Sequence, residues 1–131
     1  MIVLDTHALV WWASGDAQLS DPAREAIEAQ QESGTILVSA ISAWEIAMLV
    51  KAGRLALTMD VQAWLETLSE VPGVRFAPVG VRESVLSVNL PGEFHKDPAD
   101  RLIVATARQH GASLVTADLK IRNYPHVQTV W

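Results

Sequence analysis

The sequence predicts an α/β fold in which a mainly parallel sheet of four to five strands is flanked by helices. Short apolar runs alternate along the chain with longer stretches of helical pattern, an order typical of parallel sheets with crossover helices. Half of the 131 residues are hydrophobic and 19% are charged, so the chain can bury a core. No repeat, low-complexity stretch or linker interrupts it, and we expect one domain over residues 1–131.

The first half of the chain contains two apolar runs and a clear helix-start signal. Ser20 is a good N-cap, and Pro22 suits the first turn of the helix that follows it. Glycines mark where the helical patterns stop. The expected elements are a strand at residues 2–4, helical turns at 8–13, a helix from 20 to 34, a strand at 36–38 and a helix from Ser42 to about Lys51.

In the second half, Pro91 and Gly92 place a loop at residues 89–96. Asp97 followed by Pro98 is the pattern of a capped helix start. The expected elements are a helix at 60–68, a strand at 74–77, helices at 81–88 and 98–109, a strand at 114–116 and, as an additional candidate, a fifth strand at 127–130.

Composition excludes several classes of site. The chain has no cysteine, which removes disulfides, thiolate metal sites and a cysteine nucleophile and fits a reducing cytoplasm. We expect no membrane span and no signal peptide, since no apolar run is long enough and no basic segment precedes the first strand. The net charge of −5 argues against nucleic-acid binding, unless some of the acids hold metal ions.

Four carboxylates follow strands or lie in the first turn of helices. Asp5 comes directly after the first strand and Asp118 lies two residues after the fourth, while Glu45 and Asp100 lie near the starts of predicted helices. In a parallel sheet, ligand sites lie beyond the carboxyl ends of the strands. Acids that converge there repel one another unless a cation lies between them, and oxygen ligands suit Mg²⁺ or Mn²⁺.

Each acid also has a structural explanation. Glu45 completes a capping box with Ser42, Asp97 is an ordinary N-cap, and Asp100 and Asp118 suit a helix start or a turn. Asp5 is harder to explain in this way, because no capping box follows it. His7 and His95 lie near the predicted site, but isolated histidines are more often surface groups, or groups that support a ligand from behind, than ligands or bases.

Four segments resemble the motifs of PIN-domain proteins, in the family's order. They are residues 2–8 (IVLDTHA), 38–46 (VSAISAWEI), 95–107 (HKDPADRLIVATA) and 114–118 (LVTAD). The end of the chain, from Tyr124 to Trp131, resembles the VapC-type toxins of this family.

The resemblance implies a three-layer PIN-like domain with the activity of a Mg²⁺- or Mn²⁺-dependent endoribonuclease. It assigns Asp5, Glu45, Asp100 and Asp118 to the metal site, with Thr6, Asp97 and Thr116 as supporting residues. Metal-activated water would hydrolyse an RNA phosphodiester, leaving a 5′-phosphate and a 3′-hydroxyl, and would thereby inhibit translation and growth.

The resemblance also implies partners. We expect an RNA substrate, a homodimer and a cognate antitoxin whose C-terminal segment wraps the toxin and places an arginine in the acidic site. Four apolar residues are candidates for the antitoxin groove, although core packing is the commoner role of each: Trp11, Trp12, Trp44 and Met48. From the residues themselves, six basic side chains are candidates for phosphate contact, although solvated surface charge is the commoner role of each: Lys51, Arg54, Lys96, Arg101, Lys120 and Arg122.

Two other readings remain open at this stage. Phosphatases of the haloacid-dehalogenase kind also carry an acid after the first strand, but they place a second aspartate where this chain has His7. A receiver-like or scaffold domain would bind Mg²⁺ without catalysis, but receiver domains carry adjacent acids after the first strand, whereas Asp5 stands alone. An RNase assay with and without EDTA distinguishes these alternatives.

Overall fold

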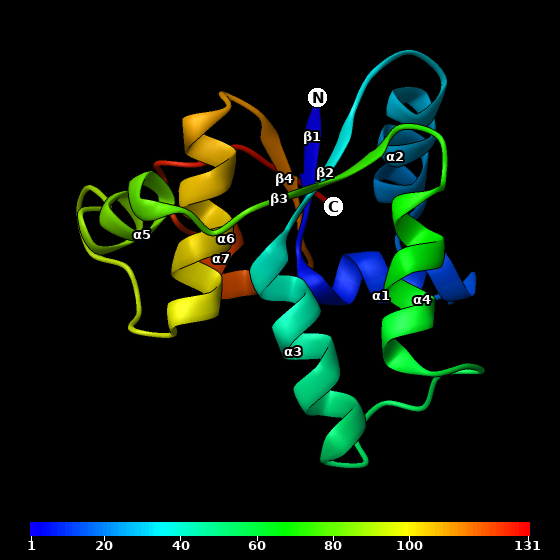
Figure 1. The fold of residues 1–131 in the computed structure, drawn as a ribbon. Helices are drawn as coiled ribbons and strands as arrows, with labels where there is room; N and C mark the ends of the chain where they lie inside the picture. The colour runs from blue at the N-terminus through cyan, green and yellow to red at the C-terminus, as the bar shows by residue number, and fades with distance from the viewer.

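A computed structural model describes residues 1–131 and contains a five-stranded parallel sheet in the order β3-β2-β1-β4-β5 (Figure 1). The strands are β1 (Ile2–Leu4), β2 (Ile36–Ser39), β3 (Val74–Ala77), β4 (Ser113–Val115) and β5 (Thr129–Val130). All four neighbouring pairs are parallel. The predicted α/β class and the fifth strand are both confirmed.

Seven helices accompany the sheet. They are α1 (Thr6–Ser14), α2 (Asp21–Ser33), α3 (Ala40–Lys51), α4 (Val61–Ser69), α5 (Val81–Val88), α6 (Pro98–Gln109) and α7 (Leu119–Arg122). Figure 1 shows α1, α2 and α4 on one side of the sheet and α5, α6 and α7 on the other, which gives the expected three layers. None of these helices is long and apolar enough to cross a membrane.

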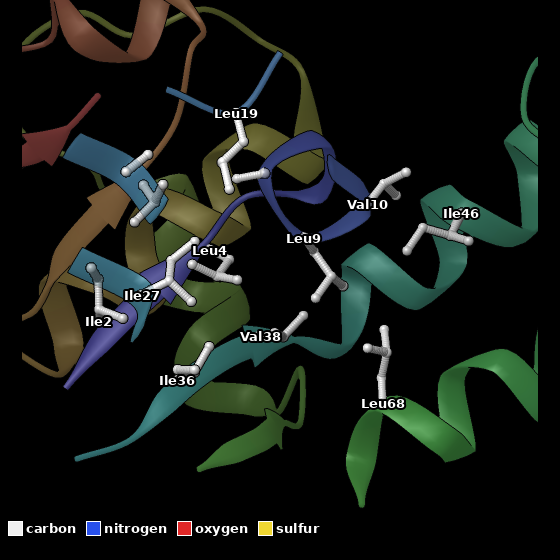
Figure 2. Close-up of a cluster of buried hydrophobic side chains, with 13 residues drawn as sticks. Ile2, Leu4, Leu9, Val10, Leu19, Ile27, Ile36, Val38, Ile46 and Leu68 are labelled. Atoms are coloured by element: carbon white, nitrogen blue, oxygen red, sulfur yellow. The ribbon is translucent and has the colours of Figure 1, made fainter. Parts of the chain in front are cut away.

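The alternation of side chains along the strands divides the core in two, because successive residues of a strand point to opposite faces. On one face Leu4 lies in the same cluster as Leu9 of α1 and Ile27 of α2. Figure 2 shows Leu9 extending from α1 toward α3. On the other face Val3 lies with Ile103 of α6. Each fully buried Leu or Ile stabilises the fold by roughly 1.5–3 kcal/mol, so these contacts hold both helical layers.

The register of the central strands brings their carboxyl ends to one level. Leu4 pairs with Val38 on one side and with Val115 on the other. The residues that follow, Asp5 and Thr116, therefore lie side by side, and the Asp5 N–H donates to the Val115 carbonyl at 3.1 Å. Helices α1, α3 and α7 all begin near this edge of the sheet (Figure 1).

Several predicted boundaries differ from the structure. Helix α1 begins at Thr6 rather than near residue 8, and α3 begins at Ala40 rather than Ser42. In both cases a residue at the end of the strand caps the helix: the side chains of Asp5, directly after β1, and Ser39, the last residue of β2, accept from backbone N–H groups of the first turn. The short helix α7 was not predicted, because four residues carry too little periodicity.

Candidate active site

A cavity of about 450 Å³ lies at the carboxyl edge of the sheet. Its lining consists of Asp5, Thr6, His7, Trp11, Glu45, Asp97, Asp100, Ile103, Ala117 and Asp118. The structure thus brings together the four predicted acids, together with two of the three supporting residues. The third, Thr116, is fully buried directly behind the cavity.

Asp5 is the most buried of these acids, with 7% of its surface exposed. Its Oδ1 accepts from the Ala8 N–H at 2.8 Å, so Asp5 is the N-cap of α1. The expectation that Asp5 has no capping role is therefore wrong. Burial raises the pKa of Asp5 above its ordinary value, although hydrogen bonds from the Thr116 hydroxyl and the Ala8 N–H oppose that rise.

Glu45 lies in the second turn of α3, because that helix begins at Ala40. Ser39, not Ser42, caps the helix, so the predicted capping box of Ser42 and Glu45 is wrong. Glu45 Oε1 instead lies 2.5 Å from the Thr6 hydroxyl, which lies 2.9 Å from the Ser42 hydroxyl. Burial is the main cause of the raised pKa of Glu45, and the nearby charges of Asp100 and Asp97 raise it further.

Asp100 lies in the first turn of α6 and faces a histidine from the preceding loop. Its Oδ2 lies 2.6 Å from His95 Nε2. Burial raises the pKa of Asp100, the His95 hydrogen bond lowers it, and the charges of Asp97 and Asp118 raise it again. Asp97 caps α6, since its Oδ1 accepts from the Asp100 N–H at 3.0 Å, and it also lines the cavity.

Asp118 and Asp5 are linked by one hydroxyl group. Thr116 Oγ1 accepts from the Asp118 N–H at 3.0 Å and also hydrogen-bonds to Asp5. Asp118 Oδ1 in turn accepts from the Lys120 N–H at 2.8 Å and caps α7. Thr116 therefore contacts two of the acids from behind the cavity, and its supporting role stays a prediction.

The donor set of the cavity suits a hard divalent cation. Its acidic side chains offer only oxygen ligands, which Mg²⁺ and Mn²⁺ prefer. Burial is the main cause of the raised pKa values of Asp5, Glu45 and Asp100, so keeping these three groups ionised costs free energy that a bound cation would offset. No three Asp, Glu or His side chains are arranged to hold one ion together. Mg²⁺ needs fewer protein ligands than this, since it keeps several bound waters and binds through one or two carboxylates.

Sequence reasoning undervalued two residues of this site. It left His95 between a surface group and a group that supports a ligand, and the structure shows His95 in contact with Asp100. It treated Ser42 as a cap, whereas Ser42 is fully buried against Thr6. The spacing of Ser42 and Glu45 did carry a signal, because residues three apart share one helix face. Arg101 is not a phosphate contact, since its guanidinium donates to four backbone carbonyls: those of Ser87, Val88, Phe94 and His95.

The chain is similar to known proteins over nearly its full length. The PIN domain family matches residues 2–127. Ribonuclease VapC22 from Mycobacterium tuberculosis H37Rv is 41% identical over 134 residues, which cover 99% of this chain and 98% of that protein.

Several solved structures share this fold, among them a toxin–antitoxin complex from Klebsiella pneumoniae, with a TM-score of 0.67, 23% identity and coverage of 97% of this chain and 95% of that one. Another is VapBC2 from Rickettsia felis bound to promoter DNA, with a TM-score of 0.69, 19% identity and coverage of 98% of this chain and 97% of that one. A third is FitAcB from Neisseria gonorrhoeae, with a TM-score of 0.67, 20% identity and coverage of 98% and 96%. The fold, the motifs and the 41% identity to VapC22 over nearly the full length all point to one family, and the chain belongs to the PIN domain family, in the VapC group.

Proposed function

We propose that this chain is a single-domain, Mg²⁺- or Mn²⁺-dependent endoribonuclease and the toxin of a toxin–antitoxin pair. One observation carries the proposal: Asp5, Glu45, Asp100 and Asp118, which are far apart in sequence, line one cavity at the carboxyl edge of the sheet. The similarity to a protein named as a ribonuclease supports the same activity. It favours an enzyme over a receiver-like domain that only binds Mg²⁺.

The four acids supply the carboxylates that would hold the metal, one or two of them directly and the others through water. When bound, the metal lowers the pKa of water and offsets negative charge on the phosphate. Thr6 and Thr116 orient Glu45 and Asp5, and Asp97 adds negative charge at the rim. The reaction hydrolyses an RNA phosphodiester and leaves a 5′-phosphate and a 3′-hydroxyl, as the resemblance implies. It would act in the cytoplasm and inhibit translation and growth.

The antitoxin has a candidate site beside the acids. A cavity of about 600 Å³ is lined mainly by apolar residues, among them Ile41, Trp44 and Val79, and it shares Glu45 and Asp97 with the acidic cavity. Trp44 is 56% exposed, which is unusual for a tryptophan without a partner. An amphipathic antitoxin segment placed there would reach the acids with a basic residue.

The other groove candidates lie elsewhere. Trp11 lines the acidic cavity, Trp12 lines a separate cavity between α1 and α4, and Met48 is exposed on α3. The homodimer also stays a proposal. It has a candidate surface on α5, where Val81, Val85 and others at helical spacing are exposed.

The decisive experiment compares wild type with Asp5→Asn, using protein free of antitoxin. We expect the wild type to cleave RNA when Mg²⁺ or Mn²⁺ is present and to lose this activity in EDTA. We expect Asp5→Asn to be folded but inactive. Asp60→Asn is a matched control, since Asp60 also caps a helix, α4, and lies outside the cavity. Cleavage by Asp5→Asn at the wild-type rate, or cleavage that persists in EDTA, contradicts the proposal.

A further inference from the structure

A smaller cavity of about 400 Å³ has its own lining, but two of its residues are hydrogen-bonded to acids of the first cavity. It is lined by Glu93, Phe94, His95, Lys120, Asn123, Tyr124 and Pro125. Two of these residues connect it directly to the acids. The His95 ring contacts Asp100 at 2.6 Å, and the Lys120 N–H donates to Asp118 at 2.8 Å. A chain molecule lying across the acids would therefore enter this cavity next.

One wall of this cavity is made of aromatic rings held in place. The Phe94 ring centroid lies 4.2 Å from that of His95 and 4.8 Å from that of Tyr124. The Tyr124 hydroxyl donates to the Pro91 carbonyl. Arg101 donates to the carbonyls of both Phe94 and His95, and its guanidinium lies 6.0 Å from the Phe94 ring centroid. The wall is thus ordered before any ligand arrives, which reduces the entropy lost on binding.

The rim of this cavity carries polar groups that are free to bind a ligand. Lys120 and Asn123 are exposed on and just after α7, and neither the ammonium nor the side-chain amide has a partner within the chain. Glu93 adds an exposed hydrogen-bond acceptor on the opposite loop. These groups match the parts of a nucleotide: the cation suits the phosphate, the amide and the carboxylate suit the polar edge of the base, and the flat rings suit the face of the base.

We propose that this cavity is the subsite for the nucleotide next to the cleaved bond. This inference rests on the proposed ribonuclease function. Lys120 contacts the phosphate adjoining the cleaved one, the Phe94 and His95 wall contacts the base or ribose, and Asn123 and Glu93 meet the base edge. The apolar cavity beside Trp44 is the less suitable path for RNA, because it offers no cation and two acids, Glu45 and Asp97.

The phosphate contact is tested by the salt dependence of RNA binding. A short, dye-labelled single-stranded RNA of random sequence is titrated with Asp5→Asn protein at a constant low Mg²⁺ concentration. Adding Lys120→Ala should weaken binding severalfold and reduce the slope of log K against log salt by about 0.7, the value for one phosphate contact on a single strand. Arg75→Ala, exposed on the edge strand β3 and outside every cavity named above, should leave the slope unchanged.

The base contact is tested by sequencing the 5′ ends that cleavage produces. Asn123→Ala in otherwise wild-type protein should broaden the nucleotide preference at one position beside the cut, with no change in the salt slope. Asn123 is exposed and has ordinary helical backbone angles, so the variant should fold normally.

The outcomes separate this inference from the proposed function. If wild type cleaves no RNA with either metal, the proposed function fails. If wild type cleaves, but Lys120→Ala keeps the wild-type slope and Asn123→Ala keeps the wild-type preference, the subsite is wrong and the function stands. Weakened binding of the antitoxin by these variants, without any change toward RNA, also overturns the subsite.

Discussion

Asp5 affects folding in two opposite directions. As the N-cap of α1 it stabilises the helix, an effect worth roughly 0.5–2 kcal/mol at such positions. As a buried carboxylate it destabilises the fold when ionised, which is why its pKa is raised. Asparagine caps helices about as well as aspartate but carries no charge. Replacing Asp5 by Asn therefore removes only the unfavourable contribution.

Asp5→Asn should consequently raise the melting temperature in metal-free buffer at neutral pH, by on the order of 4 °C for each kcal/mol relieved. The folded pKa lies above the ordinary value of 3.8, so the folded state binds more protons and wild-type stability falls as the pH rises through that pKa. The increase in melting temperature of Asp5→Asn over wild type should therefore become smaller as the pH is lowered toward 3.8. Calorimetry across this range measures it.

Asp5→Ala serves as the matched comparison, because it removes both the charge and the cap. Its melting temperature should lie below that of Asp5→Asn at every pH. If Asp5→Asn melts at the wild-type temperature at neutral pH, with no dependence on pH, then burial of an ionised Asp5 does not weaken the fold.

At the scale of elements, the early start of α3 determines what Glu45 contacts. Because α3 begins at Ala40, Ser42 and Glu45 share the face that meets α1, where Thr6 lies. A carboxylate only accepts hydrogen bonds, so the Thr6 hydroxyl donates to Glu45 and accepts from Ser42. Two helices that follow neighbouring strands are thus coupled through one hydroxyl, and that hydroxyl orients a proposed metal ligand.

Thr6→Val keeps the shape of the side chain but removes this contact. We expect the Mg²⁺ concentration for half-maximal cleavage to rise roughly 10- to 100-fold, as is typical when a group that orients a ligand is lost. Thr6→Ser restores the hydroxyl, and its Mg²⁺ concentration for half-maximal cleavage should lie close to the wild-type value. A Thr6→Val enzyme with unchanged Mg²⁺ dependence would show that Glu45 does not need this bond.

Glu45→Gln tests the ligand itself. Gln keeps the hydrogen bond from Thr6 but loses the charge, so the fold should persist while cleavage falls more than in Thr6→Val. Glu66→Gln, on the exposed face of α4, is the control for the same change away from the cavity. Full activity in Glu45→Gln would leave Glu45 with a purely structural role.

At the scale of the whole molecule, the charged side chains behind the net charge of −5 are unevenly distributed. Acids gather in the central cavity, the apolar cavity with Trp44 adjoins them through Glu45, and Lys120 stands beside Asp118. RNA and antitoxin therefore need not use the same surface away from the acids. Under the proposed function they would compete at the acids themselves, where each complex would need a cation.

This arrangement predicts how the antitoxin controls the toxin. An antitoxin lacking its C-terminal arginines should still bind through the apolar cavity but inhibit poorly, and added Mg²⁺ should then restore cleavage. The wild-type antitoxin should need far more Mg²⁺, because an arginine fork can bridge two carboxylates and keeps its charge. Complete inhibition by the truncated antitoxin at every Mg²⁺ concentration would place control outside the acidic cavity.

The sequence by itself determined the α/β class, the order of the strands along the chain and the four acids of the site. These follow from local signals, namely apolar runs that form buried strands and acids that follow strands or lie near helix starts, and from the resemblance of four segments to the motifs of a family. Tertiary structure alone decided the contacts between distant segments. The parallel register set Asp5 beside Thr116, and the packing of α1 on α3 joined Thr6 to Glu45. The Arg101 hydrogen bonds brought His95 and the aromatic wall to the acids. Such contacts depend on register and packing between elements, which no local pattern of residues encodes.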